Sequence, residues 1–367
     1  MRVKLKDITK FSKGTQINGK NLIDDGAYSY LNGGINPSGK WNEFNVAENT
    51  VTISEGGNSS GYVNYMNEAF WCGAHCYYLY DGPKNSKYLY YALKSQQERL
   101  FRIRSGACMP NIKKSDLGNF IIEYEEDETR QEEVVKVLEK CELLIEDYNK
   151  KLALLDEAVR ARFVEMFGDI SINDKNWDNA PLGELCKIIR GGSPRPIEKF
   201  LGGEVPWIKI GDATKGDNIY LHSTKEHIIS EGVSKSRLVK AGSLIFANCG
   251  VSLGFARIIT FDGCIHDGWL ALEDIDERLD KVFLLQSLNQ MTEHFRSIAP
   301  AGTQPNLNTA IMKKYRQVIP PIELQREFIV FCEEIDKSRS RIPKSLEASQ
   351  ELFDSLMQES VSYTHLT

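Results

Sequence analysis

Apolar and polar residues follow two different periods along this chain, and each period occurs twice. Up to about residue 122, short apolar segments rich in β-branched and aromatic residues are separated by Gly, Asn, Asp and Pro, which is typical of strands and turns in a mostly β domain. Beyond Thr129 the apolar residues recur in steps of four and three, the period of a long helix. The strand pattern then returns, and a second heptad pattern follows it. The chain is therefore predicted to contain two β-rich units, each followed by a helix.

The first heptad pattern is the stronger one and extends from Thr129 to Met166. A helix of this extent is on the order of 55 Å long at ~1.5 Å per residue, more than a compact domain needs, so we expect it to act as a spacer. Its apolar seam consists of Val134, Leu138, Ile145, Tyr148, Leu152, Leu155 and Val159.

The second heptad pattern keeps the same spacing but contains more serine, and Pro343 is expected to kink or end the helix locally. Two seams in one chain can close on each other as an antiparallel coiled coil. The alternative is that each helix packs on its own unit or drives dimerisation. The predicted seam residues are Phe328, Phe331, Ile335, Ile342, Leu352 and Leu356.

The second half of the chain repeats the first, with an offset of roughly 180 to 195 residues. Leu5–Ile8 corresponds to Leu182–Leu185, and Tyr28–Leu31 corresponds to Val205–Ile208, in the same order along the chain. Both halves also contain one segment with apolar residues at helical spacing, so each unit is predicted to be α+β.

These patterns predict six segments. The fold class is α+β, with two tandem, mostly β domains, each followed by a long helix, and the two helices pair as an antiparallel coiled coil. The predicted bounds are 1–127 for the first β-rich domain, 128–168 for the first spacer helix, 169–180 for a linker, 181–320 for the second domain, 321–360 for the second spacer helix and 361–367 for a frayed or foreign tail.

Charge is distributed unevenly along the chain. The net charge is −6 for 367 residues, but residues 1–122 carry 15 basic and 10 acidic side chains, whereas residues 123–168 carry 7 and 14. A basic or neutral domain surface can therefore still meet phosphate, because the excess acid lies mainly in the helices. We expect a soluble cytoplasmic protein with reduced cysteines, since the chain has no long apolar run and its eight cysteines form no regular framework.

The sequence offers little to catalysis. Cys72, His75 and Cys76 could supply metal ligands, but no second pair lies at zinc-finger spacing, so structural thiols are the preferred interpretation. The six histidines do not occur in a recognisable catalytic motif. His75 and His266-Asp267 occupy equivalent places in the two halves, which suggests a role in packing. No catalytic residue, metal or bound cofactor is expected.

Loops rich in Gly, Ser, Asn, Gln and Arg suit close approach to a DNA duplex. Glycine lets backbone N–H groups reach phosphate, while Asn, Gln and Arg can recognise base edges. An ordinary solvated turn is the alternative for each residue taken singly. The predicted DNA-binding residues are Lys13, Thr15, Gln16, Asn111, Lys113, Lys114, Arg190, Ser193, Arg195, Lys209, Arg257, Thr303, Gln304, Asn306 and Asn308.

Several motifs together resemble the specificity subunits of type I restriction-modification systems, and this resemblance covers nearly the whole chain. The segments that carry it are Pro181–Leu185, Arg190–Pro196, Val205–Asp212, Gly242–Ile245, Pro320–Arg326, Lys344–Glu347 and Ser355–Gln358.

The resemblance implies two target-recognition domains, each recognising one half of a bipartite asymmetric site in double-stranded DNA. In that family the paired helices set the gap and dock two methyltransferase subunits, and restriction or translocase subunits join the complex. S-adenosylmethionine, ATP and Mg²⁺ would then be bound only by the partner subunits. Half-sites about one helical turn apart, ~34 Å, suit the predicted spacer.

Two other functions stay open on the residues alone. One is a coiled-coil interaction scaffold whose β-rich domains bind peptide or polysaccharide. The other is an enzyme built on Cys72, His75 and Cys76.

Overall fold

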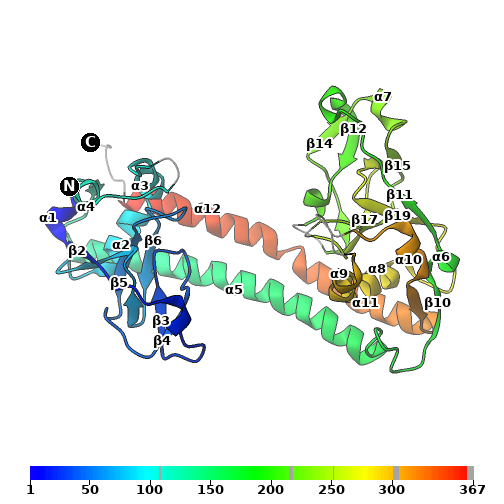
Figure 1. Cartoon of the computed structure of the whole chain (residues 1–367), viewed down its shortest axis with the longest axis horizontal. Coiled ribbons are helices and arrows are strands. Elements are labelled where there is room, and N and C mark those ends of the chain that lie inside the picture. The colour runs from blue at the N-terminus through cyan, green and yellow to red at the C-terminus, as the bar shows by residue number, and fades with distance from the viewer. Residues whose placement is uncertain (107–108, 215–217, 251, 301–305, 362–367) are drawn as a thin grey trace. The chain divides into compact units, whose positions relative to one another are not determined.

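The chain divides into two units that share one long helix. The computed structural model describes residues 1–106, 109–214, 218–250, 252–300 and 306–361. The first unit comprises Met1–Lys151 with Ile342–Thr367, and the second comprises Leu152–Arg341. Helix α5 (Glu128–Phe167) belongs to both units, because their boundary falls within it (Figure 1).

The first unit is built on two sheets and a closing strand pair. One sheet has the order β2-β8-β5-β6, the second has the order β4-β3-β7, and β1 pairs with β9. Its elements before α5 are β1 (Arg2–Lys4), α1 (Leu5–Ile8), β2 (Lys10–Lys13), the 3-10 helix Gly19–Asn21, β3 (Tyr28–Leu31), β4 (Gly39–Trp41), β5 (Thr50–Ser54), β6 (Val63–Met66), β7 (Phe70–Cys72), β8 (Cys76–Tyr80), α2 (Ser86–Lys94), α3 (Gln97–Arg102), α4 (Lys114–Gly118) and β9 (Ile121–Glu123).

Strand β5 lies inside its sheet in the first unit and is almost entirely buried. Its sequence is accordingly rich in apolar and β-branched residues and does not alternate with charged ones. Helix α2 covers the sheet and begins at Asn85, whose side chain accepts a hydrogen bond from the Tyr88 N–H at 2.9 Å. Tyr88 and Leu89 are buried in the same core as Val51 and Ile53 of β5.

The second unit contains a five-stranded sheet in the order β11-β19-β16-β17-β13 and a four-stranded sheet in the order β14-β12-β18-β15, and β10 pairs with β20. Its elements after α5 are β10 (Asp178–Pro181), α6 (Leu182–Leu185), β11 (Lys187–Arg190), the 3-10 helix Ile197–Lys199, β12 (Leu201–Ile208), the 3-10 helix Ile210–Ala213, β13 (Tyr220–Leu221), β14 (Glu226–Ile228), α7 (Ser230–Val233), β15 (Arg237–Val239), β16 (Leu244–Ala247), β17 (Ala256–Ile259), β18 (Gly263–Ile265), β19 (Trp269–Glu273), α8 (Lys281–Gln290), α9 (Thr292–Ile298), α10 (Thr309–Lys314), β20 (Arg316–Ile319) and α11 (Ile322–Arg339).

The two units repeat the same topology, which confirms the repeat seen in the sequence. The order β2-β8-β5 corresponds to β11-β19-β16, and the parallel pair β3·β7 corresponds to the parallel pair β12·β18. Each unit is closed by an antiparallel pair between its first and last strands, β1·β9 and β10·β20. The α+β class with two tandem mostly β domains is therefore correct.

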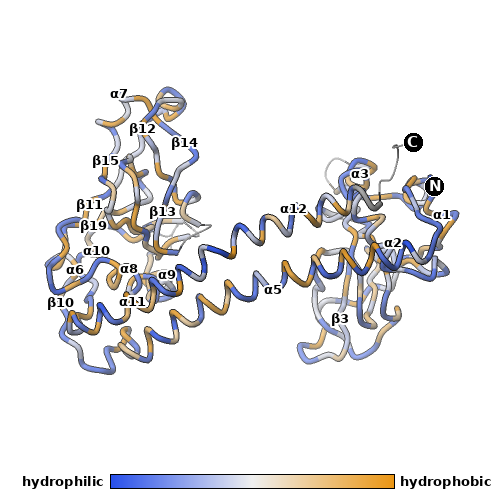
Figure 2. Tube along the Cα trace, turned by 180° about the vertical axis from the view of Figure 1, so that it is seen from behind, coloured by the Kyte–Doolittle hydropathy of each residue, from blue (hydrophilic) through white to orange (hydrophobic). Residues whose placement is uncertain are grey.

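A helix from the C-terminal part of the chain packs on α5 within each unit. In the second unit α11 runs antiparallel to α5. The rings of Phe163 and Phe167 on α5 lie against both Phe328 of α11 and Phe283 of α8, at centroid distances of 4.8 to 5.9 Å. In the first unit α12 (Ile342–Val361) contributes Met357 to a buried cluster with Leu138 and Tyr91. Apolar and polar residues alternate along these helices (Figure 2).

The second spacer consists of two helices, which corrects the prediction of one helix over 321–360. Helix α11 ends at Arg339 and α12 begins at Ile342, so the break falls at Ser340 and Arg341. Pro343 is the second residue of α12, where its missing N–H costs no intrahelical hydrogen bond. The predicted tail beyond residue 361 lies outside the described residues.

One seam residue was placed on the wrong face by the heptad spacing. Leu352 is 52% exposed, whereas the neighbouring Phe353 lies against the cluster of Leu138 and Met357. The larger aromatic ring takes the place facing α5, and its centroid lies 6.4 Å from that of Tyr91.

Candidate nucleic-acid interface

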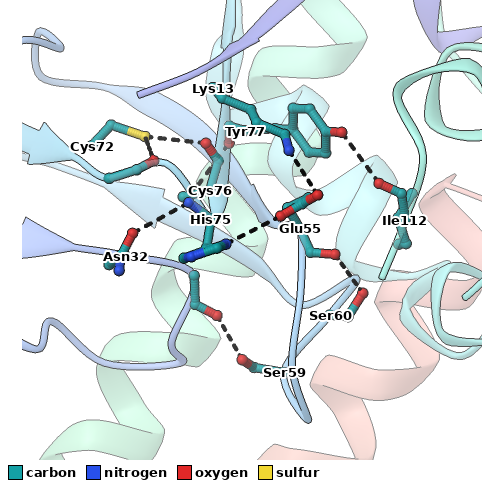
Figure 3. Close-up of polar contacts among 12 residues, drawn as sticks. Lys13, Asn32, Glu55, Ser59, Ser60, Cys72, His75, Cys76, Tyr77 and Ile112 are labelled. Carbon is teal, nitrogen blue, oxygen red and sulfur yellow. Dashed lines mark hydrogen bonds and ion pairs between the residues drawn. The ribbon is translucent and has the colours of Figure 1, made fainter. Parts of the chain in front are cut away.

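In the first unit, Glu55 holds two basic side chains at the end of the central strand. Lys13 Nζ lies 2.7 Å from Glu55 Oε1, and His75 Nδ1 lies 3.4 Å from Glu55 Oε2. Figure 3 shows the lysine, from β2, and the imidazole, from the turn between β7 and β8, reaching the same carboxylate. The carboxylate is mostly buried, whereas the lysine and the histidine are exposed. The Glu55 carboxylate therefore holds the exposed side chains of Lys13 and His75 at the surface.

A glycine turn sets the start of this cluster. The Gly14 N–H, directly after β2, donates to the carbonyl oxygen of Gly73 at 3.2 Å. A Cβ at Gly14 would lie 1.8 Å from the Cys72 carbonyl oxygen, so only glycine fits this approach. Thr15 and Gln16 follow on the surface, and the Thr15 N–H donates to the Cys72 carbonyl oxygen at 2.8 Å.

A third loop of the first unit joins the same place. The Ile112 N–H donates to the Glu55 carbonyl oxygen at 2.9 Å, which puts Asn111 beside the Glu55 turn. The Asn111 side chain is exposed and accepts a hydrogen bond from the Ser105 hydroxyl at 3.1 Å. Lys113 and Lys114 are also exposed, at the start of α4. The structure thus brings Lys13 and Asn111 together through Glu55.

In the second unit, Asp267 takes the organising role that Glu55 has in the first. The Ser193 hydroxyl donates to Asp267 Oδ1 at 2.7 Å, and a guanidinium nitrogen of Arg195 lies 3.6 Å from Oδ2. Arg190 Nε donates to the Asp267 backbone carbonyl at 3.1 Å. Asp267 lies in the turn between β18 and β19, which is the equivalent of the turn that carries His75 between β7 and β8.

The pKa values of this cluster follow from burial and neighbouring charge. Partial burial acts to raise the pKa of Asp267, but the Ser193 hydrogen bond and the nearby positive charges outweigh it and hold that pKa below its ordinary value. Burial lowers the pKa of His266 despite the attraction of Asp267, and Lys209, Arg190 and Arg195 lower it further. The carboxylate is therefore ionised and the imidazole neutral near pH 7.

Lys209 and Asn306 complete the second cluster. Lys209 follows β12 and forms an ion pair with Glu226. The backbone N–H of His266 donates to the carbonyl oxygen of Ile208 at 3.2 Å, which places Lys209 beside the turn of Asp267. Asn306 Oδ1 accepts a hydrogen bond at 3.2 Å from the side-chain amide of Asn248, which follows β16. The Asn248 N–H donates to the Gly268 carbonyl oxygen at 2.9 Å, so this loop also meets the turn of Asp267.

Two predicted contact residues lie apart from the cluster. Arg257 is 8% exposed on β17, where its guanidinium lies over the Phe255 ring and donates to the Ala256 carbonyl oxygen at 2.7 Å. An arginine held in this way does not present its charge at the surface, which speaks against the predicted phosphate contact. Asn308 caps α10, because its side-chain oxygen accepts from the Ile311 N–H at 3.0 Å. Thr303 and Gln304 lie outside the described residues.

The carboxylates Glu55 and Asp267 were missed as organising residues. The sequence did hold one signal, since His75 and His266-Asp267 occupy equivalent places, but packing was the interpretation given to it. The role of Glu55 and Asp267 could not be predicted from the sequence, because their basic partners lie far away along the chain, as Arg195 does from Asp267.

The arrangement of Cys72, His75 and Cys76 does not resemble a metal site. Cys72 Sγ contacts the Cys76 carbonyl oxygen at 3.4 Å, and Cys76 Sγ contacts the Tyr77 carbonyl oxygen at 3.7 Å. Both thiols are buried, and the pKa of the Cys72 thiol is raised, first by its contact with Cys76 and then by burial. Within the described part of the chain, no group of three potential ligand side chains lies close enough to hold a metal ion.

Comparison with known proteins identifies the family. The model of the type I restriction modification DNA specificity domain matches residues 1–156 and 174–348. A putative type I specificity subunit of Mycoplasma genitalium is 25% identical over 369 residues, covering 95% of this chain and 90% of the relative. A putative type I specificity subunit of Mycoplasma pneumoniae is 30% identical over 246 residues, covering 59% of this chain and 63% of that relative, so this match spans less than two thirds of it.

A solved structure has the same fold. The crystal structure of a type I restriction-modification S subunit from M. genitalium matches with a TM-score of 0.65 at 22% identity, over 100% of this chain and 96% of that one. The chain therefore belongs to the type I restriction-modification DNA specificity family. It is a specificity subunit, the non-catalytic component whose general role is recognition of DNA sequence. None of the helices in the described ranges is both long and apolar enough to span a bilayer.

Proposed function

We propose that this chain recognises a bipartite, asymmetric site in double-stranded DNA, with one half-site contacted by each unit. It would position two methyltransferase subunits and, with them, restriction or translocase subunits on that site in the cytoplasm. S-adenosylmethionine, ATP and Mg²⁺ would be bound by those partners. The family and the names of its relatives support a role with such subunits.

One observation carries the proposal. Both units gather exposed basic and amide side chains at the same ends of equivalent strands, around one carboxylate. Lys13 of the first unit ends β2, which pairs with β8, the strand after the turn of His75. Arg190 of the second unit ends β11, which pairs with β19, the strand after the equivalent turn of Asp267. Two copies of one recognition surface in a single chain suit two half-sites, and their different residues suit different half-sites.

The chemistry of each cluster matches DNA recognition. Lysine and arginine neutralise phosphate and release counterions, while Arg, Asn and Gln recognise base edges in the major groove. A fixed carboxylate can accept a hydrogen bond from the cytosine amino group. Glu55 and Asp267 therefore have two proposed uses, holding the basic side chains in place and discriminating cytosine.

The experiment maps methylated adenines across the genome of a host that expresses this chain with its methyltransferase, against a host that lacks only this chain. We expect a split motif that appears only with the chain. The double variant Arg190→Ala/Arg195→Ala should relax or abolish one half of that motif, at about 1–3 kcal/mol for each lost base contact. Arg278→Ala is the matched control, since Arg278 is an exposed arginine of the same unit whose guanidinium pairs with the nearby Asp276 at 2.8 Å.

An unchanged methylome would contradict the proposal and favour the interaction scaffold. The salt dependence of binding in vitro distinguishes DNA recognition from the interaction scaffold. Affinity for duplex DNA should fall steeply as salt rises, whereas peptide or polysaccharide binding by a scaffold would be largely indifferent to salt.

A further inference from the structure

A polar network joins three parts of the second unit at one place. Asp156 of α5 forms an ion pair with Arg339 of α11 and accepts a hydrogen bond from the Asn218 side-chain amide at 2.8 Å. The Asn218 side-chain oxygen lies 3.4 Å from the guanidinium of Arg257 on β17. Strand β17 belongs to the sheet that contains β11 and β19, the strands next to the Asp267 cluster. The network therefore links both helices to the sheet that holds the proposed DNA contacts.

This network lies where both helices leave the second unit. Arg339 is the last residue of α11, directly before the break at Ser340 and Arg341. Asp156 lies close to Leu152, the first residue of the unit on α5. The Arg339 side chain is only 12% exposed and also faces Asp336, at 3.8 Å. A well-buried arginine at a helix end is costly unless its partners are fixed, so this position is a specific contact.

A cavity lies beside the helices at this place, although Val159 of α5 and Cys332 of α11, which also line it, belong to the apolar core of the unit. Asp156, Arg339, Asn218 and Arg257 line this cavity of about 190 Å³. The apolar anchor is the ring cluster of Phe163 and Phe328, which lies about 10 Å further along α5 at 1.5 Å per residue. One anchor alone would leave the helices free to pivot on the sheet. A second anchor at a distance from it fixes the angle between helices and sheet.

We propose that the Asp156–Arg339 ion pair is a positioning contact that fixes the direction in which the helices leave the second unit. It thereby limits the gap length that the protein accepts between its two half-sites. This inference rests on the proposed function, since a gap has meaning only for a bipartite site. Ion pairs that are partly buried contribute little net stability but can select one geometry, which is the role assigned here.

Two variants remove the ion pair with little change of shape. In Asp156→Asn the side-chain oxygen can still accept the hydrogen bond of Asn218, so only the charge is lost. Arg339→Gln removes the other charge, and Arg339→Lys is a milder variant that keeps the charge without the planar fork. The matched control is Glu327→Gln, which breaks the ion pair with Arg162 at 2.9 Å between the same two helices, beside the aromatic anchor.

The experiment uses the assembled methyltransferase complex and DNA duplexes with the native half-sites and a gap that is native, one base pair shorter or one base pair longer. The rate of methylation at an altered gap, divided by the rate at the native gap, is the measured quantity. We expect this ratio to rise roughly tenfold in Asp156→Asn and Arg339→Gln, equal to about 1.4 kcal/mol of lost discrimination. Arg339→Lys should fall between them and the unchanged protein, and Glu327→Gln should leave the ratio unchanged.

A purely stabilising ion pair would lower methylation by the same factor at all three gaps. An unchanged ratio in both charge-removing variants therefore overturns the positioning role, whatever happens to the overall rate or the melting temperature. If the unaltered protein itself methylates all three gaps equally, the proposed bipartite recognition fails and the inference fails with it, so the two failures are distinguishable.

Discussion

At the scale of single residues, the side chains of the proposed recognition clusters are held in place by their neighbours. The His266 imidazole is an example, because Nδ1 accepts a hydrogen bond from the Gly268 N–H at 2.8 Å while Nε2 lies 3.2 Å from Asp267. An imidazole that accepts at one nitrogen must be neutral. The geometry and the lowered pKa of His266 therefore agree.

This neutral histidine predicts acid sensitivity of the second unit. The folded-state pKa of His266 lies below its ordinary value of 6.5, so the unfolded chain takes up the proton first as pH falls. Stability is expected to be full above about pH 6.5, to fall as the pH drops through the folded-state pKa, and to level off below it. Urea midpoints at about pH 7.5 and about pH 5.5 should show this loss, and His266→Gln should reduce it. An equal loss in His266→Gln would assign the effect to other groups.

Residues were predictable from sequence where their role is local. Lys13, Arg190 and Arg195 flank glycine turns and were named as candidates for that reason. The burial of Arg257 was not predictable. An arginine in a strand can be exposed to solvent or stacked against an aromatic ring, and the sequence does not distinguish these two environments. Glu55 and Asp267 were missed because their partners come from distant strands.

At the scale of elements, α5 was predictable because its period extends over many turns. The second heptad pattern predicted the helix seam less reliably. Leu352 and Phe353 are adjacent apolar residues, and the spacing alone does not show which of them faces α5. The interruption that Pro343 predicted occurs slightly earlier in the chain, at Ser340 and Arg341. Pro343 drew attention to this part of the chain, but the helix ends just before it and restarts with it in the first turn.

The aromatic cluster between α5 and α11 predicts a large local contribution to stability. Phe328 is fully buried and stacks edge-on against Phe163 and Phe167. Phe328→Ala should destabilise the second unit by about 3–5 kcal/mol through lost burial and the cavity left behind. The matched control, Leu352→Ala at an exposed helical site, should change stability by less than about 0.5 kcal/mol. Urea unfolding followed by fluorescence measures both, and similar values for the two variants would contradict this packing.

At the scale of the whole molecule, α5 contacts a helix from the C-terminal part of the chain in each of the two units. Leu138 lies in a cluster with Met357 in the first unit, and Asp156 pairs with Arg339 in the second. The step from Leu138 to Asp156 equals the step back from Met357 to Arg339.

If the helices act as a spacer, the heptad pattern of α5 predicts that they can be lengthened in whole heptads. One heptad inserted after Lys150, with a matching heptad near the start of α12, should lengthen the pair by about 10 Å. We expect the unspecified gap of the methylated motif to grow by about three base pairs at ~3.4 Å each, with both half-sites unchanged. Methylome mapping in the same host measures the motif. A change in half-site identity would contradict a spacer role for the helices.

The strand pairs that close each unit have a consequence for how such a protein can change. In both halves the first and last strands are antiparallel neighbours, β1 beside β9 and β10 beside β20. The chain thus enters and leaves each domain on two adjacent strands. We expect that the segment between the two strands can be exchanged as a block if its contacts with the helices, such as those of Tyr91 and Phe283, are kept. If each unit contacts one half-site as proposed, recombination at these two points would give new combinations of half-sites.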